Sequence, residues 1–174
     1  MNLRIKEKFK YLKRINKKAL VCFVTAGDPG KKTYETILEF LPKAGADLIE
    51  IGIPFSDPMA DGPTIQRSSL RAIKSKVNLK YIFNFIKNFR KNDNKTPIIL
   101  MGYFNPISQY GIENFFLDSS KFGVDGLIVV DLPPEENHLI LNQSKKYGID
   151  IIRLLTPTTT SDRLKKILKS TSGF

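Results

Sequence analysis

Five apolar segments rich in β-branched residues alternate with amphipathic segments along nearly the whole chain. A strand followed by a helix, repeated in this way, predicts βα units and a parallel sheet. Two helices separate the second predicted strand from the third, so we expect an extra helix there. The predicted strands cover residues 20–25, 48–53, 98–103, 126–132 and 150–155, and the predicted helices cover residues 32–44, 64–73, 79–91, 112–122, 134–147 and 161–169.

Two similar turns precede predicted strands. The sequence AGAD at 44–47 leads into the second strand, and FGVD at 122–125 leads into the fourth. In each turn a glycine follows a helix, where a left-handed C-cap is common, and an aspartate then opens the strand. Such αβ turns lie at the bottom of a barrel, where residues stabilise the fold, so we expect a structural role for both.

Two α/β architectures fit this pattern. About five βα units plus an N-terminal helix would form an incomplete (β/α)8 TIM barrel, because a complete barrel needs roughly 200 residues or more and this chain has 174. The last residues, 172–174, resemble a helix cap and the start of a sixth strand. A doubly wound open sheet is the alternative, but no G-x-G-x-x-G sequence follows the first strand.

The net charge of +11 is distributed unevenly, since the first eighteen residues hold eight Lys or Arg and one acid, Glu7. Ile5, Phe9 and Leu12 recur there at steps of four and three, which predicts a short amphipathic helix. An organelle transit segment is an alternative, but serine is nearly absent. We favour a helix that packs through its apolar stripe and exposes a basic face to solvent.

Composition argues against several other classes of protein. The lysines are dispersed along the chain without an Arg and aromatic patch, so we expect no nucleic-acid partner. No apolar run reaches the roughly 18 residues of a membrane span. One cysteine, Cys22, permits no internal disulfide, and with the single His138 it makes a Cys/His metal site untenable, so we expect no metal. His138 is expected on the surface.

Glu50 is the most unusual residue of the predicted strands. Strand residues alternate faces, so Glu50 shares a face with Leu48 and Gly52 in an otherwise apolar segment. A buried carboxylate costs several kcal/mol unless it is paired or protonated. Catalytic groups of barrels lie near the C-terminal ends of strands, which makes Glu50 a catalytic candidate. The alternative is a structural glutamate that accepts backbone hydrogen bonds.

The loop after this strand, residues 54–63, contains three prolines and two aspartates and cannot form a regular element. Long loops at this end of a barrel commonly bind substrate. Asp61 precedes Gly62 and Pro63 at the start of a predicted helix. Taken alone, that position is typical of a turn or helix-capping aspartate.

Four motifs together resemble the tryptophan synthase alpha subunit family. They are FVTAGDPG at 23–30, IEIGIPFSDPMADGPTIQ at 49–66, MGYFNPISQYG at 101–111 and GVDGLIVVDLPPEE at 123–136, in the family's order and spacing. The resemblance extends from about residue 18 to residue 174. It implies one domain over residues 1–174 that corresponds to the N-terminal two-thirds of a TIM barrel.

The resemblance also implies roles for particular residues. It places the catalytic glutamate at Glu50 and the catalytic aspartate at Asp61. Asp131, at the end of the fourth strand, is not one of this pair, and we expect a structural role for it. The positions that line the family's indole pocket correspond to Phe23, Met101, Tyr103, Ile128 and Val130, where Met101 replaces a common leucine; ordinary barrel core is the alternative for all five.

The function implied by the resemblance is retro-aldol cleavage of indole-3-glycerol phosphate to indole and glyceraldehyde 3-phosphate in tryptophan biosynthesis. The family uses no cofactor in this subunit. Its partner is the tryptophan synthase beta subunit, which carries pyridoxal phosphate in an alpha2-beta2 complex, and the location implied is the cytoplasm, or the plastid stroma for an organelle gene. The glycine-rich phosphate loops of the family lie beyond residue 174, so we expect residues 1–174 alone to be inactive.

Other functions predict different features. Another phosphate-sugar barrel, such as an epimerase or isomerase of the ribulose-phosphate type, would need a metal-binding histidine at a strand end, and none is present. The non-enzyme alternative is a catalytically inactive fragment that only contacts a partner, and the existence of coding sequence downstream of residue 174 would decide between the two.

Overall fold

The computed structural model describes residues 2–174. Its centre is a sheet of five parallel strands, and their spatial order is their order along the chain. A doubly wound sheet reverses its order at a switch point, whereas a barrel does not. The sheet is therefore five consecutive strands of a barrel, as predicted. The strands are β1 Val21–Thr25, β2 Leu48–Gly52, β3 Ile98–Gly102, β4 Gly126–Val129 and β5 Asp150–Ile151.

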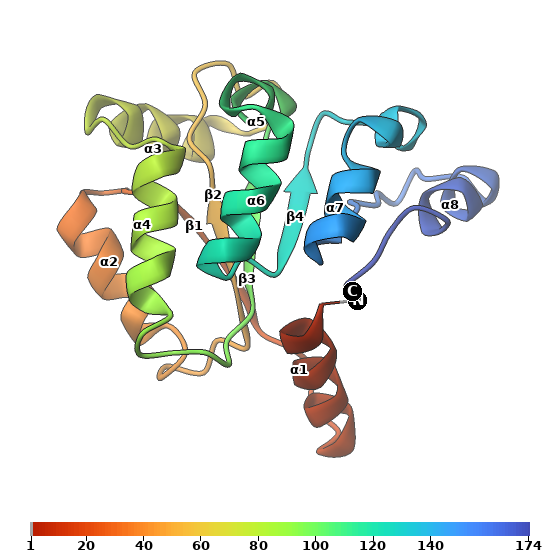
Figure 1. Ribbon diagram of the computed structural model, residues 1–174, viewed down its shortest axis with the longest axis horizontal. Coiled ribbons are helices and arrows are strands. Elements are labelled where there is room, and N and C mark those ends of the chain that lie inside the picture. The colour runs from red at the N-terminus through yellow and green to blue at the C-terminus, as the bar shows by residue number, and fades with distance from the viewer. Residues whose placement is uncertain (1) are drawn as a thin grey trace.

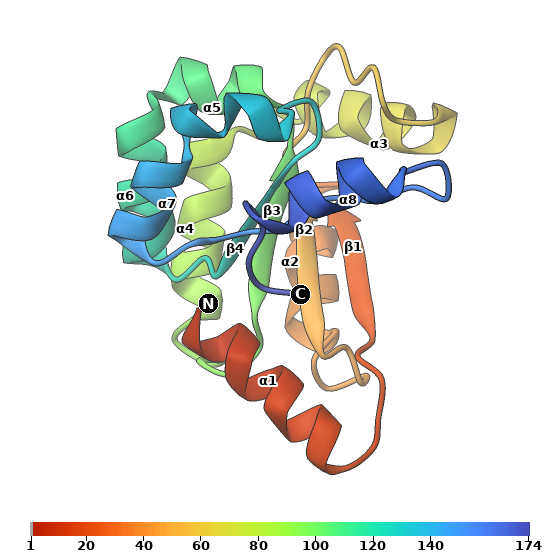
Figure 2. The same ribbon diagram turned by 90° about the vertical axis from the view of Figure 1, so that its right-hand side faces the viewer.

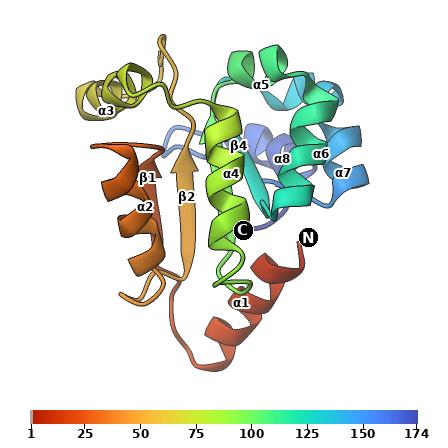
Figure 3. The same ribbon diagram turned by 60° about the vertical axis from the view of Figure 1, so that its left-hand side comes forward.

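The helices occupy three positions relative to this sheet. Helices α2, α4, α6 and α7 lie along one face, which is the outside of the barrel (Figures 1 and 3). Helices α3 and α5 lie at the carboxyl ends of the strands, and α1 lies beyond the amino ends (Figure 2). Their bounds are α1 Leu3–Arg14, α2 Lys31–Phe40, α3 Pro63–Lys74, α4 Leu79–Phe89, α5 Phe104–Tyr110, α6 Ile112–Phe122, the 3-10 helix η1 Pro134–Leu139, α7 Leu141–Tyr147 and α8 Ser161–Leu168.

Buried side chains form two clusters, one on each face of the sheet. The larger cluster packs Ile49, Ile51 and their neighbours against the outer helices. The smaller cluster lies on the inner face and contains Ile99 and Ile128, with Met101 packed against them. Glu50 alternates with Ile49 and Ile51, so it belongs to the inner face.

The aspartates at the amino ends of the strands stabilise the fold, as predicted. Asp47 accepts a hydrogen bond from the backbone N–H of Leu20 at 3.0 Å, and Asp125 accepts one from that of Ile98 at 2.8 Å. Asp125 is fully buried between Arg4 and Arg90. Gly123 has a φ of 91° and caps α6 in the left-handed conformation. These residues connect neighbouring strands at their amino ends.

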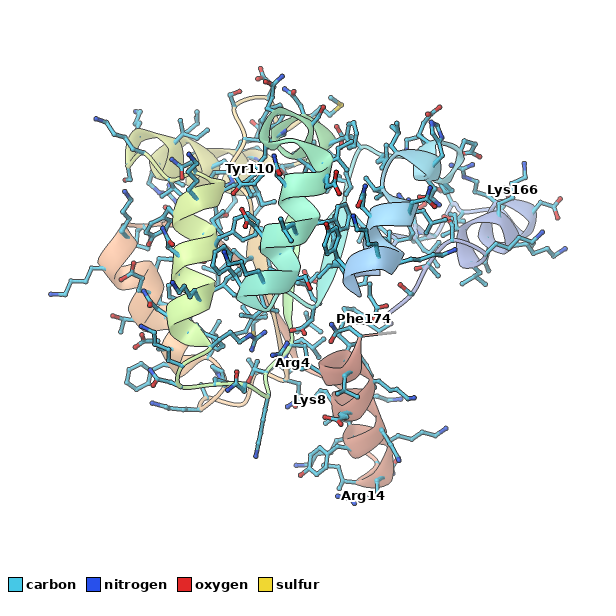
Figure 4. The ribbon with its side chains drawn as sticks, viewed as in Figure 1. Arg4, Lys8, Arg14, Tyr110, Lys166 and Phe174 are labelled. Carbon is cyan, nitrogen blue, oxygen red and sulfur yellow. The ribbon has the colours of Figure 1, made fainter. Side chains whose placement is uncertain are left out.

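Helix α1 packs through its apolar stripe, which confirms the interpretation favoured from the sequence. Ile5 and Leu12 are buried, and Ile5 joins the inner cluster. Arg4 forms its ion pair with Asp125 near the start of the helix, whereas Arg14 lies at the far end, away from the sheet (Figure 4). No helix among residues 2–174 has the length and apolar character needed to cross a membrane.

Several predicted boundaries were wrong. Helix α2 ends at Phe40 rather than at residue 44, because Pro42 has no N–H with which to continue the helix. The predicted helix 134–147 is divided into η1 and α7 at Ile140, where the backbone leaves helical geometry. Strands β4 and β5 end at residues 129 and 151 rather than at 132 and 155. Helix α5 was not predicted.

Candidate active site

Glu50 lies in the middle of β2 on the inner face of the sheet. It is opposite Phe23 of β1 and Ile99 of β3 in the parallel ladder, so apolar side chains flank it on both sides. The carboxyl is half-buried and has no hydrogen-bond or ion-pair partner among residues 2–174. Burial raises the pKa of Glu50 above its ordinary value of 4.5. Such a carboxyl keeps its proton at a higher pH than an exposed glutamate and is suited to proton transfer.

The loop that follows β2 carries Asp61 above the carboxyl ends of the strands. Its backbone is held at several points: Asp61 N–H donates to the Pro58 carbonyl at 3.1 Å, and the Gln66 side chain donates to the Asp61 carbonyl at 2.8 Å. The N-cap of α3 is Gly62, which has no side chain, and no side-chain capping bond forms at this helix end. Asp61 therefore does not cap this helix.

Tyr103 joins this loop to the end of β3. Its hydroxyl accepts a hydrogen bond from the backbone N–H of Ala60 at 3.0 Å, and its ring lies 5.3 Å from that of Phe55. Burial raises the pKa of the Tyr103 hydroxyl, and the negative charge of Asp61 raises it further. Tyr103 thus binds the backbone of Ala60, the residue before Asp61, and lies close enough to Asp61 for the charge of that carboxylate to affect the Tyr103 pKa.

A small cavity of about 20 Å³ lies between the loop and the inner face of the sheet. Gly52 is at its floor, where a Cβ would come within 2.6 Å of the Phe23 ring, so a larger residue there would have to displace the Phe23 side chain. The volume holds about one water molecule. The cavity is lined by Phe23, Thr25, Gly52, Ile53, Asp61, Ile65, Ser69, Met101, Gly102, Tyr103 and Val130.

The structure thus gathers most of the predicted site residues around one cavity. Asp61, Phe23, Met101, Tyr103 and Val130 line it directly. Ile128 is buried in the inner cluster beside Met101 and Val130. Glu50 lies outside the wall, two residues before Gly52 on the same face of β2, so it is adjacent to the floor of the cavity.

Sequence reasoning missed the polar contacts beneath α3. The Thr25 hydroxyl lies 2.7 Å from the Ser68 hydroxyl, and both side chains are buried. Ile65, Ser69 and Ala72 share this face of α3 with Ser68. Their spacing of three and four residues could have identified the face of the helix that packs on the site.

Other candidates have simpler positions. Asp131 accepts a hydrogen bond from the backbone N–H of Phe104 at 2.7 Å, at the first turn of α5, which is the structural role expected of it. The His138 side chain is 70% exposed, as predicted. Among residues 2–174, His, Cys, Asp and Glu side chains form no group of three that could hold a metal ion.

The comparisons with known proteins agree with this geometry. The sequence profile of the family "Tryptophan synthase alpha chain" matches residues 9–174. A tryptophan synthase alpha chain from Granulibacter bethesdensis is 53% identical over 171 residues, which cover 98% of this chain and 62% of that protein. The crystal structure of tryptophan synthase subunit alpha from Legionella pneumophila superposes with a TM-score of 0.95 at 44% identity, covering 99% of this chain and 66% of that one.

A structure of tryptophan synthase from M. tuberculosis also superposes, with a TM-score of 0.93 at 30% identity, covering 100% of this chain and 69% of the other. The chain therefore spans a little less than two thirds of the length of the Granulibacter and Legionella proteins.

Proposed function

This chain belongs to the tryptophan synthase alpha chain family, and on that basis we propose that the protein is a carbon–carbon lyase that cleaves indole-3-glycerol phosphate. The products are indole and glyceraldehyde 3-phosphate. One observation carries the proposal beyond family membership: a half-buried, unpartnered carboxyl, Glu50, lies beside a cavity whose wall includes a second carboxylate, Asp61.

Retro-aldol cleavage of this substrate makes three chemical demands. Carbon C3 of the indole must be protonated, which gives an indolenine cation that can accept the electrons of the breaking bond. The glycerol hydroxyl must lose its proton as the C–C bond breaks, which leaves an aldehyde. The N–H of the cation must face a negative charge. The proton gained at C3 and the proton lost from the hydroxyl balance, so neither a metal nor an organic cofactor is needed.

Glu50 meets the first two demands in our proposal. Burial raises the pKa of Glu50, so its carboxyl keeps a proton to a higher pH than an exposed glutamate and can deliver a proton to C3 and accept the hydroxyl proton. Asp61 meets the third demand. It lies on the loop after β2 and lines the cavity, so its carboxylate can face the indole N–H.

The apolar wall would hold the indole ring. Phe23, Met101, Tyr103 and Val130 line the cavity, and Ile128 supports it from below. A cavity of about 20 Å³ is too small for a bicyclic ring. The Phe23 side chain, 37% exposed and lying over Gly52, is the group that we expect to swing aside when substrate enters.

We further propose that the protein acts with a tryptophan synthase beta subunit in the cytoplasm. The beta subunit would carry pyridoxal phosphate and consume the indole. The proposed contact surface is the loop 54–61 together with residues 102–107, because both lie at the carboxyl ends of the strands, beside the cavity. Indole is small and apolar, so direct transfer between subunits would prevent its loss across membranes.

The test is a turnover assay on the protein expressed from its complete gene. Purified protein is incubated with indole-3-glycerol phosphate, and indole and glyceraldehyde 3-phosphate are measured separately. We expect the two products in equal amounts. A folded protein that yields neither product would refute the proposal. A second sample limited to residues 1–174 should be inactive, because barrel enzymes commonly bind phosphate through loops after the seventh and eighth strands, and residues 2–174 form five strands.

A further inference from the structure

Two side-chain contacts join the loop after β1 to helix α3. Arg71 of α3 forms a two-point ion pair with Asp28, with Nε to Oδ1 at 2.5 Å and Nη2 to Oδ2 at 2.8 Å. One helical turn earlier, the buried Ser68 hydroxyl contacts Thr25 at 2.7 Å. We call these four residues the β1–α3 clamp. A two-point guanidinium–carboxylate pair fixes orientation as well as distance, which a lysine cannot do.

The packing beyond the clamp is equally close. Gly27 lies between Thr25 and Asp28 with a φ of +81°, and a Cβ there would come within 2.3 Å of Val77, just after α3. The loop after β1 is therefore close both to α3, through Arg71, and to the residues that follow this helix, through Val77. Figure 2 shows α3 lying across the carboxyl ends of β1 and β2.

The position of α3 determines the position of Asp61. Only Gly62 separates Asp61 from the first residue of the helix, Pro63. Gln66, in the first turns, donates its side-chain N–H to the Asp61 carbonyl at 2.8 Å. A shift or rotation of α3 would therefore move Asp61 relative to the cavity that it lines.

The charges around the clamp single out Arg71. Its side chain is 51% exposed, yet it is directed to the largely buried Asp28, which is 17% exposed. Arg67, one turn earlier on the same helix, is exposed and has no carboxylate within ion-pair distance among residues 2–174. The two arginines differ in having or lacking this partner, so Arg67 offers a matched control.

We propose that Arg71 is a positioning residue of the lyase, which acts by holding α3 through Asp28 and so fixes Asp61 against the substrate. This inference rests on the proposed function, because the position of Asp61 affects the rate only if Asp61 takes part in the proposed reaction. The β1–α3 clamp is defined by its contacts alone, so its effect on the mobility of the loop that carries Asp61 can be measured without an activity assay.

The kinetic test is a double-mutant cycle in the protein expressed from its complete gene. Arg71→Met should lower kcat for indole-3-glycerol phosphate cleavage about 10-fold with little change in KM, because a misplacement of about 1 Å can cost about 10²-fold and we expect a smaller shift here. Arg71→Lys should recover part of the loss, and Arg67→Met should match wild type. In the Asp61→Asn background, Arg71→Met should change kcat less than about 2-fold. An equal loss in both backgrounds would overturn the proposal.

The second test does not depend on activity. Chymotrypsin cleaves after Phe55 and Met59 in the loop that carries Asp61, and Met59 is 79% exposed. Cleavage at these two sites, followed by mass spectrometry, should be about two- to five-fold faster in Arg71→Met than in Arg67→Met, because an exposed ion pair shifts a local opening equilibrium by about that factor. Equal rates would overturn the proposal. If Arg71→Met is cleaved faster but the wild-type protein has no lyase activity, the proposed function is refuted, whereas the role of the β1–α3 clamp in holding the loop is supported.

Discussion

Glu50 is the residue whose chemistry the proposed reaction uses most directly. Glu50→Gln removes the transferable proton and keeps the size of the side chain, so we expect kcat to fall about 10²- to 10⁴-fold, the usual contribution of general acid–base catalysis. Thermal unfolding of the same variant checks that the fold survives. Activity within about 10-fold of wild type would contradict the assignment of Glu50.

The raised pKa of Glu50 makes a separate prediction about stability. Between the pKa of the unfolded state, near 4.5, and the higher pKa of the folded state, the folded protein binds more protons than the unfolded protein. The free energy of unfolding contributed by this group therefore falls as pH rises through that window. Glu50→Gln has no such loss, so its stability relative to wild type should increase with pH across the window and then level off.

Glu113 provides a control of opposite sign for this measurement. Its hydrogen bond and ion pair with Lys146 hold the pKa of Glu113 below its ordinary value. Its contribution to the free energy of unfolding is present at pH values above the unfolded pKa and is lost as pH falls through the folded pKa. Urea unfolding from a pH below the folded pKa of Glu113 up to pH 8 should show Glu113→Gln losing stability relative to wild type as pH rises through the acidic end of that range. The same trend for both variants would contradict the assigned pKa shifts.

Asp61 should contribute through its charge rather than through proton transfer. Asp61→Asn places a neutral amide opposite the indolenine cation, so we expect a loss in kcat of about 10²- to 10³-fold, as for removal of one preorganised electrostatic group. Exchange of deuterium into C3 of indole distinguishes this role from that of Glu50, because it reports proton transfer alone. If exchange stops in the Asp61 variant and continues in the Glu50 variant, the two roles are reversed.

At the scale of elements, the sequence predicted every strand and the helices α1, α2, α3, α4, α6 and α8, because each has a local pattern of apolar residues. Helix α5 had no such pattern. It contains Pro106 in its first turn, where a missing N–H is tolerated, and its N-cap residue Tyr103 makes no side-chain capping bond. The first amide of the helix, that of Phe104, is instead bonded to Asp131, 27 residues later. A contact so distant in sequence leaves no local signal.

The site shows the same limit. The resemblance to the family supplied the expected roles of Glu50 and Asp61 and the expected pocket positions Phe23, Met101 and Val130. The position of Asp61 depends on Ser68, Arg71 and the loop after β1, which come together only in the folded chain. The cavity around Asp61 therefore could not be described from the sequence.

The capping of α5 by Asp131 makes a prediction at this scale. Asp131→Ala removes the acceptor for the Phe104 N–H, so we expect a loss of about 0.5–2 kcal/mol in the free energy of unfolding, as for other helix caps. Asp131→Asn keeps an acceptor oxygen and should lose much less. Urea unfolding of the three proteins measures the difference. Equal stability of the alanine variant and wild type would show that this bond contributes nothing.

At the scale of the whole molecule, the two ends of the strands differ in how their charged side chains are paired. At the amino ends, aspartates and Arg90 satisfy backbone groups and bury charge among one another. At the carboxyl ends, Asp61 and Glu50 have no comparable ion pairs among residues 2–174. The loop 54–61 and the first turn of α5 meet there through Tyr103, whose hydroxyl binds the Ala60 amide. A partner that contacts α5 could therefore move the loop that carries Asp61.

This arrangement predicts that a beta subunit activates the lyase. When beta subunit is titrated into the protein expressed from its complete gene, kcat should rise about 5- to 150-fold, the range of typical coupling free energies between sites. Pro58 restricts the loop, and its carbonyl accepts the Asp61 N–H at 3.1 Å. Pro58→Ala should loosen the loop, lower the rate without beta subunit and give a larger relative activation. Complex formation is measured independently by sedimentation, so that weak binding is not mistaken for absent coupling. A lyase rate that stays unchanged on saturation, in wild type and variant alike, would show that the loop is simply rigid and that beta-subunit binding is not coupled to the position of Asp61.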